Sequence, residues 1–299
     1  MRLFRDSLPL AALAILASVC GSPKAKDDGM GVQIAFKFAV NGKPFTCDQT
    51  YTGVGTNPDA GGQVYRGRFA RFYVYGVRLI NDAGEEVPVT LAEDGAWQIP
   101  SKGVVEIDGE VGSGCVGTGS NLSVVGTVPH GAYSGLKLTV GLPNDVNHLQ
   151  ADAQPSPLNQ SEMYWSWTSG YRFLRIEGWD ETGTKSLKGG LLHLGSTGCV
   201  PNDAPANGGP YDLSKGATCR YPNTIDLAFD QFDPEANAVV ADIGTLFSTT
   251  DLVRGGGGCM SEVTDRDCPG VFGQLSLPYA DGDGGLVISE RGQTVFTKE

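Results

Sequence analysis

The amino-acid sequence predicts an all-β protein: a single-domain antiparallel β-sandwich with Greek-key-like connections and long loops stapled by disulfides. Three observations lead to this expectation. Short runs of alternating or β-branched residues recur between turn residues along the chain. Glycine (43 residues) and proline (17 residues) are abundant and spread throughout. Helix signals are nearly absent, and many short strands separated by turns are typical of β-sandwiches and barrels.

Each expected strand follows from a local pattern. Residues 32–40 alternate and end at the turn pair Asn41-Gly42, which favours a hairpin. Residues 68–80 form a longer run in which Gly76 predicts a kink. Further strands are expected at residues 104–108, 121–128, 136–142, 171–180, 189–195 and 224–232. The largest loops are expected at residues 143–163 and 199–223.

The composition and net charge of the chain limit which partners are expected. The chain has 299 residues, 40% of them hydrophobic, which is enough to bury a substantial core. Its formal net charge is -12, and its sequence pI is about 4.7. Nucleic acid is therefore excluded as an expected partner, because phosphate binding requires a basic face. The acidity is typical of a solvated surface.

The N-terminus predicts export. Arg2 and Arg5 precede an apolar run, residues 8–20, that is short for a bilayer-spanning helix. The run ends at Cys20, as in a bacterial lipobox, although Val19 and Ala17 depart from the usual residues. We expect a signal peptide at residues 1–20, with Cys20 as the site of any lipidation. A flexible tether at residues 21–30 and a β-domain at residues 31–299 follow.

The remaining cysteines predict disulfides. Without Cys20 the count is an even six, and an exported chain with an even count favours disulfide bonds. Six cysteines allow 15 pairings. No two cysteines have the CxxC spacing that is typical of a zinc ribbon, so a zinc ribbon is not expected. We expect a local staple, a bridge across a Pro/Asn/Gly-rich loop and a long-range bridge: Cys259–Cys268, Cys199–Cys219 and Cys47–Cys115.

Two tryptophans and two histidines are the candidate functional residues. Trp165 and Trp167 lie two residues apart, on one face of a strand. Taken alone, such a pair is usually core packing. The strands at 171–178 and 189–195 are expected to be antiparallel neighbours, which would bring the tryptophans near His193. His148 follows another expected strand.

Other sequence motifs give weaker support for a functional site. His130 lies in a turn and receives no role. The chain has no GxSxG nucleophile motif. The sequence DGDGG at 281–285 lacks the closing Glu of a calcium loop, so we expect a turn there. Met163 is expected to fill the core rather than to bind a metal.

Taken together, several segments resemble the MbnP-like copper-binding proteins, the exported four-Cys proteins of the metallo-mystery pair system. The resemblance covers nearly all of the chain after the tether. Its most specific parts are MYWSW…GYRFLR and HLGSTGC. The segments that carry it are FAVNGKPFTC, RFYVYGVRLI, VGTVPHGAYSGLKLTVGLPNDVNH, PLNQSEMYWSWTSGYRFLRIEG, HLGSTGC and GCMSEVTDRDCPGVF.

The resemblance implies a periplasmic or outer-membrane-anchored protein that binds one copper ion and is not an enzyme. It implies a MauG-like dihaem partner, MbnH-like, that oxidises Trp165 or Trp167 to kynurenine. His148 and His193 would be the histidine ligands, and Cys47, Cys115, Cys199 and Cys219 the four family cysteines. The implied role is copper homeostasis. An envelope adhesion or binding module without a metal is the alternative.

Overall fold

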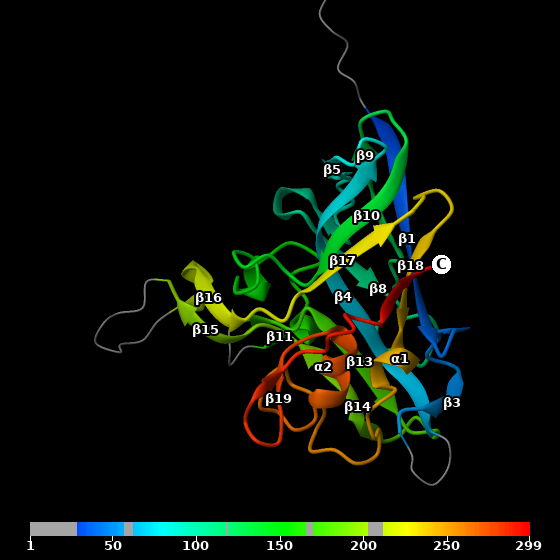
Figure 1. Cartoon of the computed structure of the whole chain (residues 1–299), viewed down its shortest axis with the longest axis vertical. Helices are drawn as coiled ribbons and strands as arrows, with labels where there is room; N and C mark the ends of the chain where they lie inside the picture. Colours follow the sequence, from blue (N-terminus) through cyan, green and yellow to red (C-terminus); the bar gives the residue numbers. More distant parts are fainter. Residues whose placement is uncertain (1–28, 57–61, 118, 166–169, 203–211) are drawn as a thin grey trace, which may run out of the picture.

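The structure, a computed structural model, describes residues 29–56, 62–117, 119–165, 170–202 and 212–299. Two β-sheets form most of it, and short helices and hairpins lie around them (Figure 1). The predicted signal peptide, Cys20 and Trp167 lie outside the described residues. Within the described part, no helix is long and apolar enough to cross a membrane.

The first sheet is built on the N-terminal strand. Its strand order is β21-β18-β1-β9-β6, and β2 pairs with the end of β1. β1 pairs with β18 in parallel and with β9 and β2 antiparallel. The β1–β18 ladder thus departs from the wholly antiparallel expectation. The strands are β1 (Met30–Val40), β2 (Lys43–Pro44), β6 (Thr90–Leu91), β9 (Ser123–Val128), β18 (Ala238–Asp242) and β21 (Phe296–Lys298).

The second sheet is organised around β4, a strand of 19 residues. The main order is β14-β13-β4-β10-β17, with β3, β5 and β8 also on β4 and β7 on β8. The strands are β3 (Thr50–Val54), β4 (Gln63–Asn81), β5 (Glu86–Pro88), β7 (Gln98–Ile99), β8 (Val104–Asp108), β10 (Tyr133–Val140), β13 (Leu174–Trp179), β14 (Ser186–Leu194) and β17 (Ile225–Asp230).

Three small hairpins and short helices complete the structure. The α-helices are α1 (Ile243–Phe247) and α2 (Pro269–Leu275), and 3-10 turns occur at Pro100–Lys102, Ala151–Ala153, Ser161–Met163 and Leu213–Lys215. The hairpins are β11 (Tyr164–Trp165) with β12 (Gly170–Tyr171), β15 (Thr197–Pro201) with β16 (Ala217–Tyr221), and β19 (Tyr279–Ala280) with β20 (Leu286–Val287). The all-β prediction is confirmed.

The two sheets meet through aromatic side chains. Phe36 and Phe38 of β1 lie 6.0 and 5.4 Å from Phe72 of β4, between ring centroids. Phe296 of β21 packs edge-on against the same ring at 5.5 Å. All four are buried. Burying each such ring contributes about 1.5–3 kcal/mol, so this cluster is a main reason why the sheets stack.

The predicted turn and kink both form. Asn41 and Gly42 have positive φ angles of 51° and 73°, as a tight turn between paired strands requires. Asp242 stabilises this turn by accepting hydrogen bonds from both backbone N–H groups, at 3.0 and 2.8 Å. Gly76 has φ 62° and lies where the β4–β10 register shifts. The long strand can therefore bend there without strain on a β-carbon.

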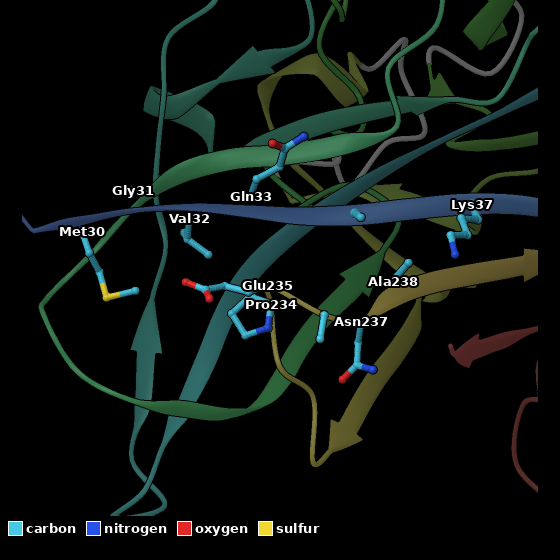
Figure 2. A pocket seen from close by; sticks show the side chains of 11 residues that line it. Met30, Gly31, Val32, Gln33, Lys37, Pro234, Glu235, Asn237 and Ala238 are labelled. Carbon is cyan, nitrogen blue, oxygen red and sulfur yellow. The ribbon is translucent and has the colours of Figure 1, made fainter.

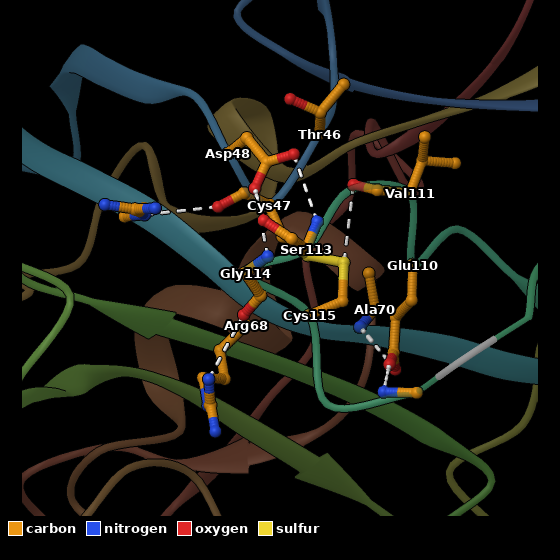
Figure 3. Close-up of a disulfide and its surroundings, with 12 residues drawn as sticks. Thr46, Cys47, Asp48, Arg68, Ala70, Glu110, Val111, Ser113, Gly114 and Cys115 are labelled. Atoms are coloured by element: carbon orange, nitrogen blue, oxygen red, sulfur yellow. Dashed lines mark hydrogen bonds between the residues drawn. A yellow bond between two sulfur atoms is a disulfide. The ribbon is translucent and has the colours of Figure 1, made fainter.

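Three disulfides join the cysteines in the expected pairs: Cys47–Cys115, Cys199–Cys219 and Cys259–Cys268. Figure 3 shows Asp48 beside the first of them, accepting hydrogen bonds from the backbone of Ser113 and Gly114. Cys199 and Cys219 face one another across β15–β16. The expected loop at residues 199–223 thus contains most of a hairpin, which projects to one side of the sheets (Figure 1).

Candidate metal centre

The β11–β12 hairpin positions Trp165. Trp165 pairs with Gly170 across the hairpin, and its side chain is 5% exposed. The ring packs against the backbone at Gly195: a β-carbon there would lie 2.7 Å from Trp165 Cζ3. Only glycine allows this close approach. Trp167 lies in the part of the chain that the structure does not describe.

His193 lies on β14, next to β13 as the sequence predicted. It stands opposite Arg175 in the antiparallel register. Its imidazole centroid lies 6.4 Å from that of the Trp165 ring. Its Nε2 lies 2.6 Å from Oε1 of Glu177. The predicted approach of the tryptophan segment to His193 is therefore present for Trp165.

The charges around His193 form a compact network. Arg175 contacts the same Glu177 oxygen, with Nη2 at 2.5 Å. Arg172 Nη1 lies 3.5 Å from His193 Nδ1. Burial raises the pKa of Glu177, but the hydrogen bond from His193 and the charge of Arg175 outweigh it and hold that pKa below its ordinary value. The carboxylate is therefore ionised at neutral pH.

Burial also affects the pKa values of His193 and Arg172. It lowers the pKa of His193, and the hydrogen bond to Glu177 opposes this only in part. The imidazole is thus neutral at neutral pH. Burial and the nearby Arg175 lower the pKa of Arg172 to about 10, so this guanidinium stays charged. A neutral imidazole has a lone pair for a metal.

His148 lies against Gly170 of the same hairpin. It is 4% exposed and lies in the segment after β10. A β-carbon at Gly170 would lie 3.2 Å from its Nδ1, so this nitrogen faces the residue that pairs with Trp165. Its Nε2 lies 3.3 Å from Cys219 Sγ and 3.2 Å from the side-chain nitrogen of Asn147. The Tyr171 N–H donates to the Asn147 carbonyl at 3.0 Å and fixes this segment to β12.

Two histidines lie against the same hairpin, and both offer nitrogen donors of the kind that copper accepts. The hairpin brings Trp165 to His193 and Gly170 to His148. Asn147 Oδ1 is buried and has no hydrogen-bond partner among the described residues, which leaves an electron-rich oxygen beside His148. Imidazole nitrogens suit copper and zinc alike.

A second cluster has metal-ligand spacing but the wrong chemistry. The ligand atoms of His148, Cys199 and Cys219 lie within 4.8 Å of one another. Both sulfurs are bonded to each other, and a metal is bound by a thiolate rather than by a disulfide. In the oxidised protein this cluster is therefore structural.

The remaining sequence candidates lie elsewhere. His130 is exposed in a turn, and Met163 is fully buried in the core. The segment Asp281–Gly285 is a turn between β19 and β20. In it Asp281 Oδ1 accepts hydrogen bonds from the backbone N–H groups of Asp283 and Gly285. The expected turn is present, and its carboxylate is engaged by the backbone.

The charged neighbours of His193 were not predicted from the sequence. Arg175 and Glu177 alternate with apolar residues along β13, so a period of two places them on one face. Once β13 is paired with β14, that face includes His193. The signal was present in the sequence, but it becomes informative only when the strand register is known.

A buried charge cluster was also missed. Arg71 Nε lies 3.0 Å from Asp108 and 2.8 Å from Glu110, and all three side chains are buried. Gln160 accepts from Arg71 and donates to buried Glu106, both at 2.5 Å. Gln160 directly precedes the Ser161–Met163 turn that leads into β11. The cluster therefore anchors the segment that carries Trp165.

A surface pocket lies apart from these residues. It has a volume of about 500 Å³ and runs along β1 and the segment before β18 (Figure 2). Its lining includes Met30, Val32 and Glu235. Neither His148, Trp165 nor His193 lines it, so it is separate from the candidate metal centre.

Comparisons with known proteins point to one family. The MbnP family model matches residues 30–261, a region that contains His148, Trp165, Trp167 and His193. Among solved structures, the chain is similar to MbnP from Methylosinus trichosporium, with 32% sequence identity and a TM-score of 0.72. That match covers 90% of this chain and 98% of the other. A search of curated proteins finds no match.

Proposed function

Because the chain belongs to the MbnP family, we propose that it is an exported copper-binding protein rather than an enzyme. One copper ion would be held by His148, His193 and a kynurenine formed from Trp165 or Trp167. The observation that carries the proposal is the meeting of Trp165, His193 and, through Gly170, His148 at one hairpin.

The donor chemistry explains why a modified tryptophan is needed. A neutral indole nitrogen only donates a hydrogen bond and has no lone pair for a metal. Oxidative opening of the ring to kynurenine yields an aryl amine, which has such a lone pair. Two imidazoles and one aryl amine make a nitrogen set that suits copper. Bound copper would be the metal cation that these three nitrogens hold. The three disulfides leave no thiolate among the six paired cysteines to compete for it.

The proposal includes a partner and a place in the cell. A MauG-like dihaem protein, MbnH-like, would oxidise the tryptophan in the envelope. The mature protein would be periplasmic, or held at the outer membrane through a lipid on Cys20. Its role would be copper homeostasis. The family relationship and the predicted export segment support these points.

The test begins with mass analysis of the peptide that contains Trp165 and Trp167. Protein isolated together with its dihaem partner should show one ring carbon replaced by an oxygen, the signature of kynurenine. Protein made without the partner should keep both tryptophans and bind copper poorly. Full-affinity binding by unmodified protein would show that kynurenine is unnecessary.

Histidine variants test the ligand set. His148→Ala and His193→Ala should each weaken copper binding strongly, because each removes one of three proposed donors. His130→Ala is the matched control, since His130 is exposed and distant in sequence from both. Circular dichroism should report an unchanged fold in all three. Unchanged copper affinity in the double variant of His148 and His193 would reject the site and favour the metal-free binding module.

A further inference from the structure

His193 presents its two ring nitrogens to groups of opposite charge. Nε2 lies 2.6 Å from Glu177 Oε1. The same oxygen is contacted by Nε and Nη2 of Arg175, which can only donate, so Oε1 acts as an acceptor and Nε2 of His193 as a donor. The lone pair of the imidazole is therefore on Nδ1.

Glu177 is itself held in place. Arg175 contacts Glu177 Oε1 through Nε and Nη2, both at 2.5 Å. Arg175 Nη1 also donates to the Glu162 carbonyl at 2.7 Å. The carboxylate is thus fixed between His193 and Arg175. A carboxylate behind a metal-binding histidine sets both the tautomer and the ring orientation.

The Nδ1 side of the ring faces a cation. Arg172 Nη1 lies 3.5 Å from Nδ1. Arg172 Nη2 lies 3.4 Å from the carbonyl oxygens of Ser161 and Tyr164, which lead into the strand of Trp165. The guanidinium therefore lies between the lone pair of His193 and the segment that carries the tryptophan.

We propose that Glu177 positions His193 with Nδ1 as its copper-binding nitrogen. We propose also that Arg172 holds this nitrogen in the metal-free protein and moves away when copper binds. The inference rests on the proposed function. A copper ion on Nδ1 would lie close to the charged guanidinium of Arg172. Repulsion at that distance in a partly buried site is large, so the two cations exclude one another.

Nitrogen-15 NMR of histidine-labelled protein tests the nitrogen assignment. The protein should be isolated with its dihaem partner and titrated anaerobically with Cu(I) supplied as its acetonitrile complex. In metal-free protein, His193 should show a protonated Nε2 and an unprotonated Nδ1. Cu(I) should then shift the Nδ1 resonance. A shift confined to Nε2 would overturn this inference and leave the copper site standing. No shift at either nitrogen of His193 or His148 would reject the copper site itself, and this inference with it.

Variants of Arg172 test the competing cation. Arg172→Gln should raise Cu(I) affinity roughly tenfold, because the repelling charge is gone. Arg172→Lys keeps the charge and should stay near the wild-type affinity. Arg254→Gln is the control for net charge, since Arg254 is highly exposed. Weaker or unchanged binding by a folded Arg172→Gln would overturn the role of Arg172.

Variants of Glu177 test positioning. Glu177→Gln retains a carbonyl oxygen that can accept from Nε2, so it should preserve the tautomer. Glu177→Leu should populate both tautomers and lower Cu(I) affinity. If Glu177→Leu keeps the single wild-type tautomer, Glu177 is not the positioning residue. Should either variant fail to fold, the tautomer and the copper-induced shift in the wild-type protein still decide the question.

Discussion

Gly195 lies against the six-membered ring of Trp165. A β-carbon at position 195 would lie 2.7 Å from Trp165 Cζ3 and 2.5 Å from the Tyr171 carbonyl oxygen. Both distances are too short for real atoms, so the backbone of β12 or the indole ring would have to move. The position of the tryptophan beside His193 therefore depends on the absence of a side chain at residue 195.

Gly195→Ala should consequently disturb both stability and copper binding. We expect a loss of about 1–3 kcal/mol in the free energy of unfolding, as is typical of an overpacked core. Urea denaturation measures it, and Cu(I) titration of the partner-modified protein measures the second effect. Gly31→Ala is the control, because a β-carbon there meets nothing within 4 Å. Wild-type stability and affinity in Gly195→Ala would contradict the packing described.

Gly170→Ala should separate binding from stability. A β-carbon at position 170 would lie 3.2 Å from His148 Nδ1 and 3.3 Å from its Cε1. These contacts are tight, and a shift of a few tenths of an ångström in the imidazole would relieve them. We expect Cu(I) affinity to fall about tenfold or more while the unfolding free energy changes by about 1 kcal/mol or less. Unchanged affinity would argue that copper binding does not depend on the position of His148 against Gly170.

Most strands and the Cys259–Cys268 staple, whose cysteines are 9 residues apart, were predictable because their signals are local. Alternation in residues 32–40 and the pair Asn41-Gly42 determine a hairpin from adjacent residues alone. The strands around Arg175 and His193 are joined by a short connection, so their pairing could also be predicted. The parallel β1–β18 ladder could not, because it joins residues 35–39 to residues 238–242, and no local pattern selects that pairing.

Buried charges were the least predictable part of the structure. Glu106 and Asp108 lie in the run VVEID, where period two would place charged residues on a solvated face. β8 is instead buried at all five positions, because Arg71 of β4 and Gln160 of a distant loop satisfy those carboxylates. The compensating residues are far apart in sequence, so only the tertiary structure reveals them.

The same cluster makes stability depend on pH. Burial raises the pKa of Glu106 to about 8 and that of Asp108 to about 7. Both groups bind protons more tightly in the folded protein than in the unfolded chain, where their pKa values are about 4. The stabilisation that comes from this tighter proton binding is thus complete at low pH. It is lost as the pH rises through the pKa values of the folded protein. We expect the unfolding free energy to fall between about pH 4 and pH 8.

Glu106→Gln isolates this effect. The amide keeps the shape of the side chain and an oxygen that can accept from Gln160, but it does not titrate. Denaturant unfolding between pH 6 and 8 should therefore show a smaller loss of stability in Glu106→Gln than in the wild type. Glu290→Gln, at an exposed position, should leave the profile unchanged. An identical pH profile in Glu106→Gln and the wild type would show that Glu106 does not hold an extra proton when folded.

Reduction of the Cys199–Cys219 bridge should create a second metal site, one that depends on free thiols. Both cysteines are half-exposed on the projecting hairpin, whereas Cys259 and Cys268 are 1% and 0% exposed. A limiting amount of a phosphine should therefore reduce Cys199–Cys219 before Cys259–Cys268, delivering two electrons and leaving two thiols. Mapping of alkylated cysteines by mass spectrometry identifies the bond that opens.

Reduction would place two thiols beside an imidazole, since Cys219 Sγ lies 3.3 Å from His148 Nε2. Two thiolates and one histidine are a favourable donor set for Zn²⁺. Reduced and desalted protein should bind one Zn²⁺ ion that the oxidised protein does not bind, as measured with a chromophoric chelator. The Cys199→Ser, Cys219→Ser double variant should bind none and should lose about 3 kcal/mol of stability, because it no longer closes this loop. If the reduced wild type and the double variant take up Zn²⁺ equally, the contact between His148 and Cys219 does not create a metal site.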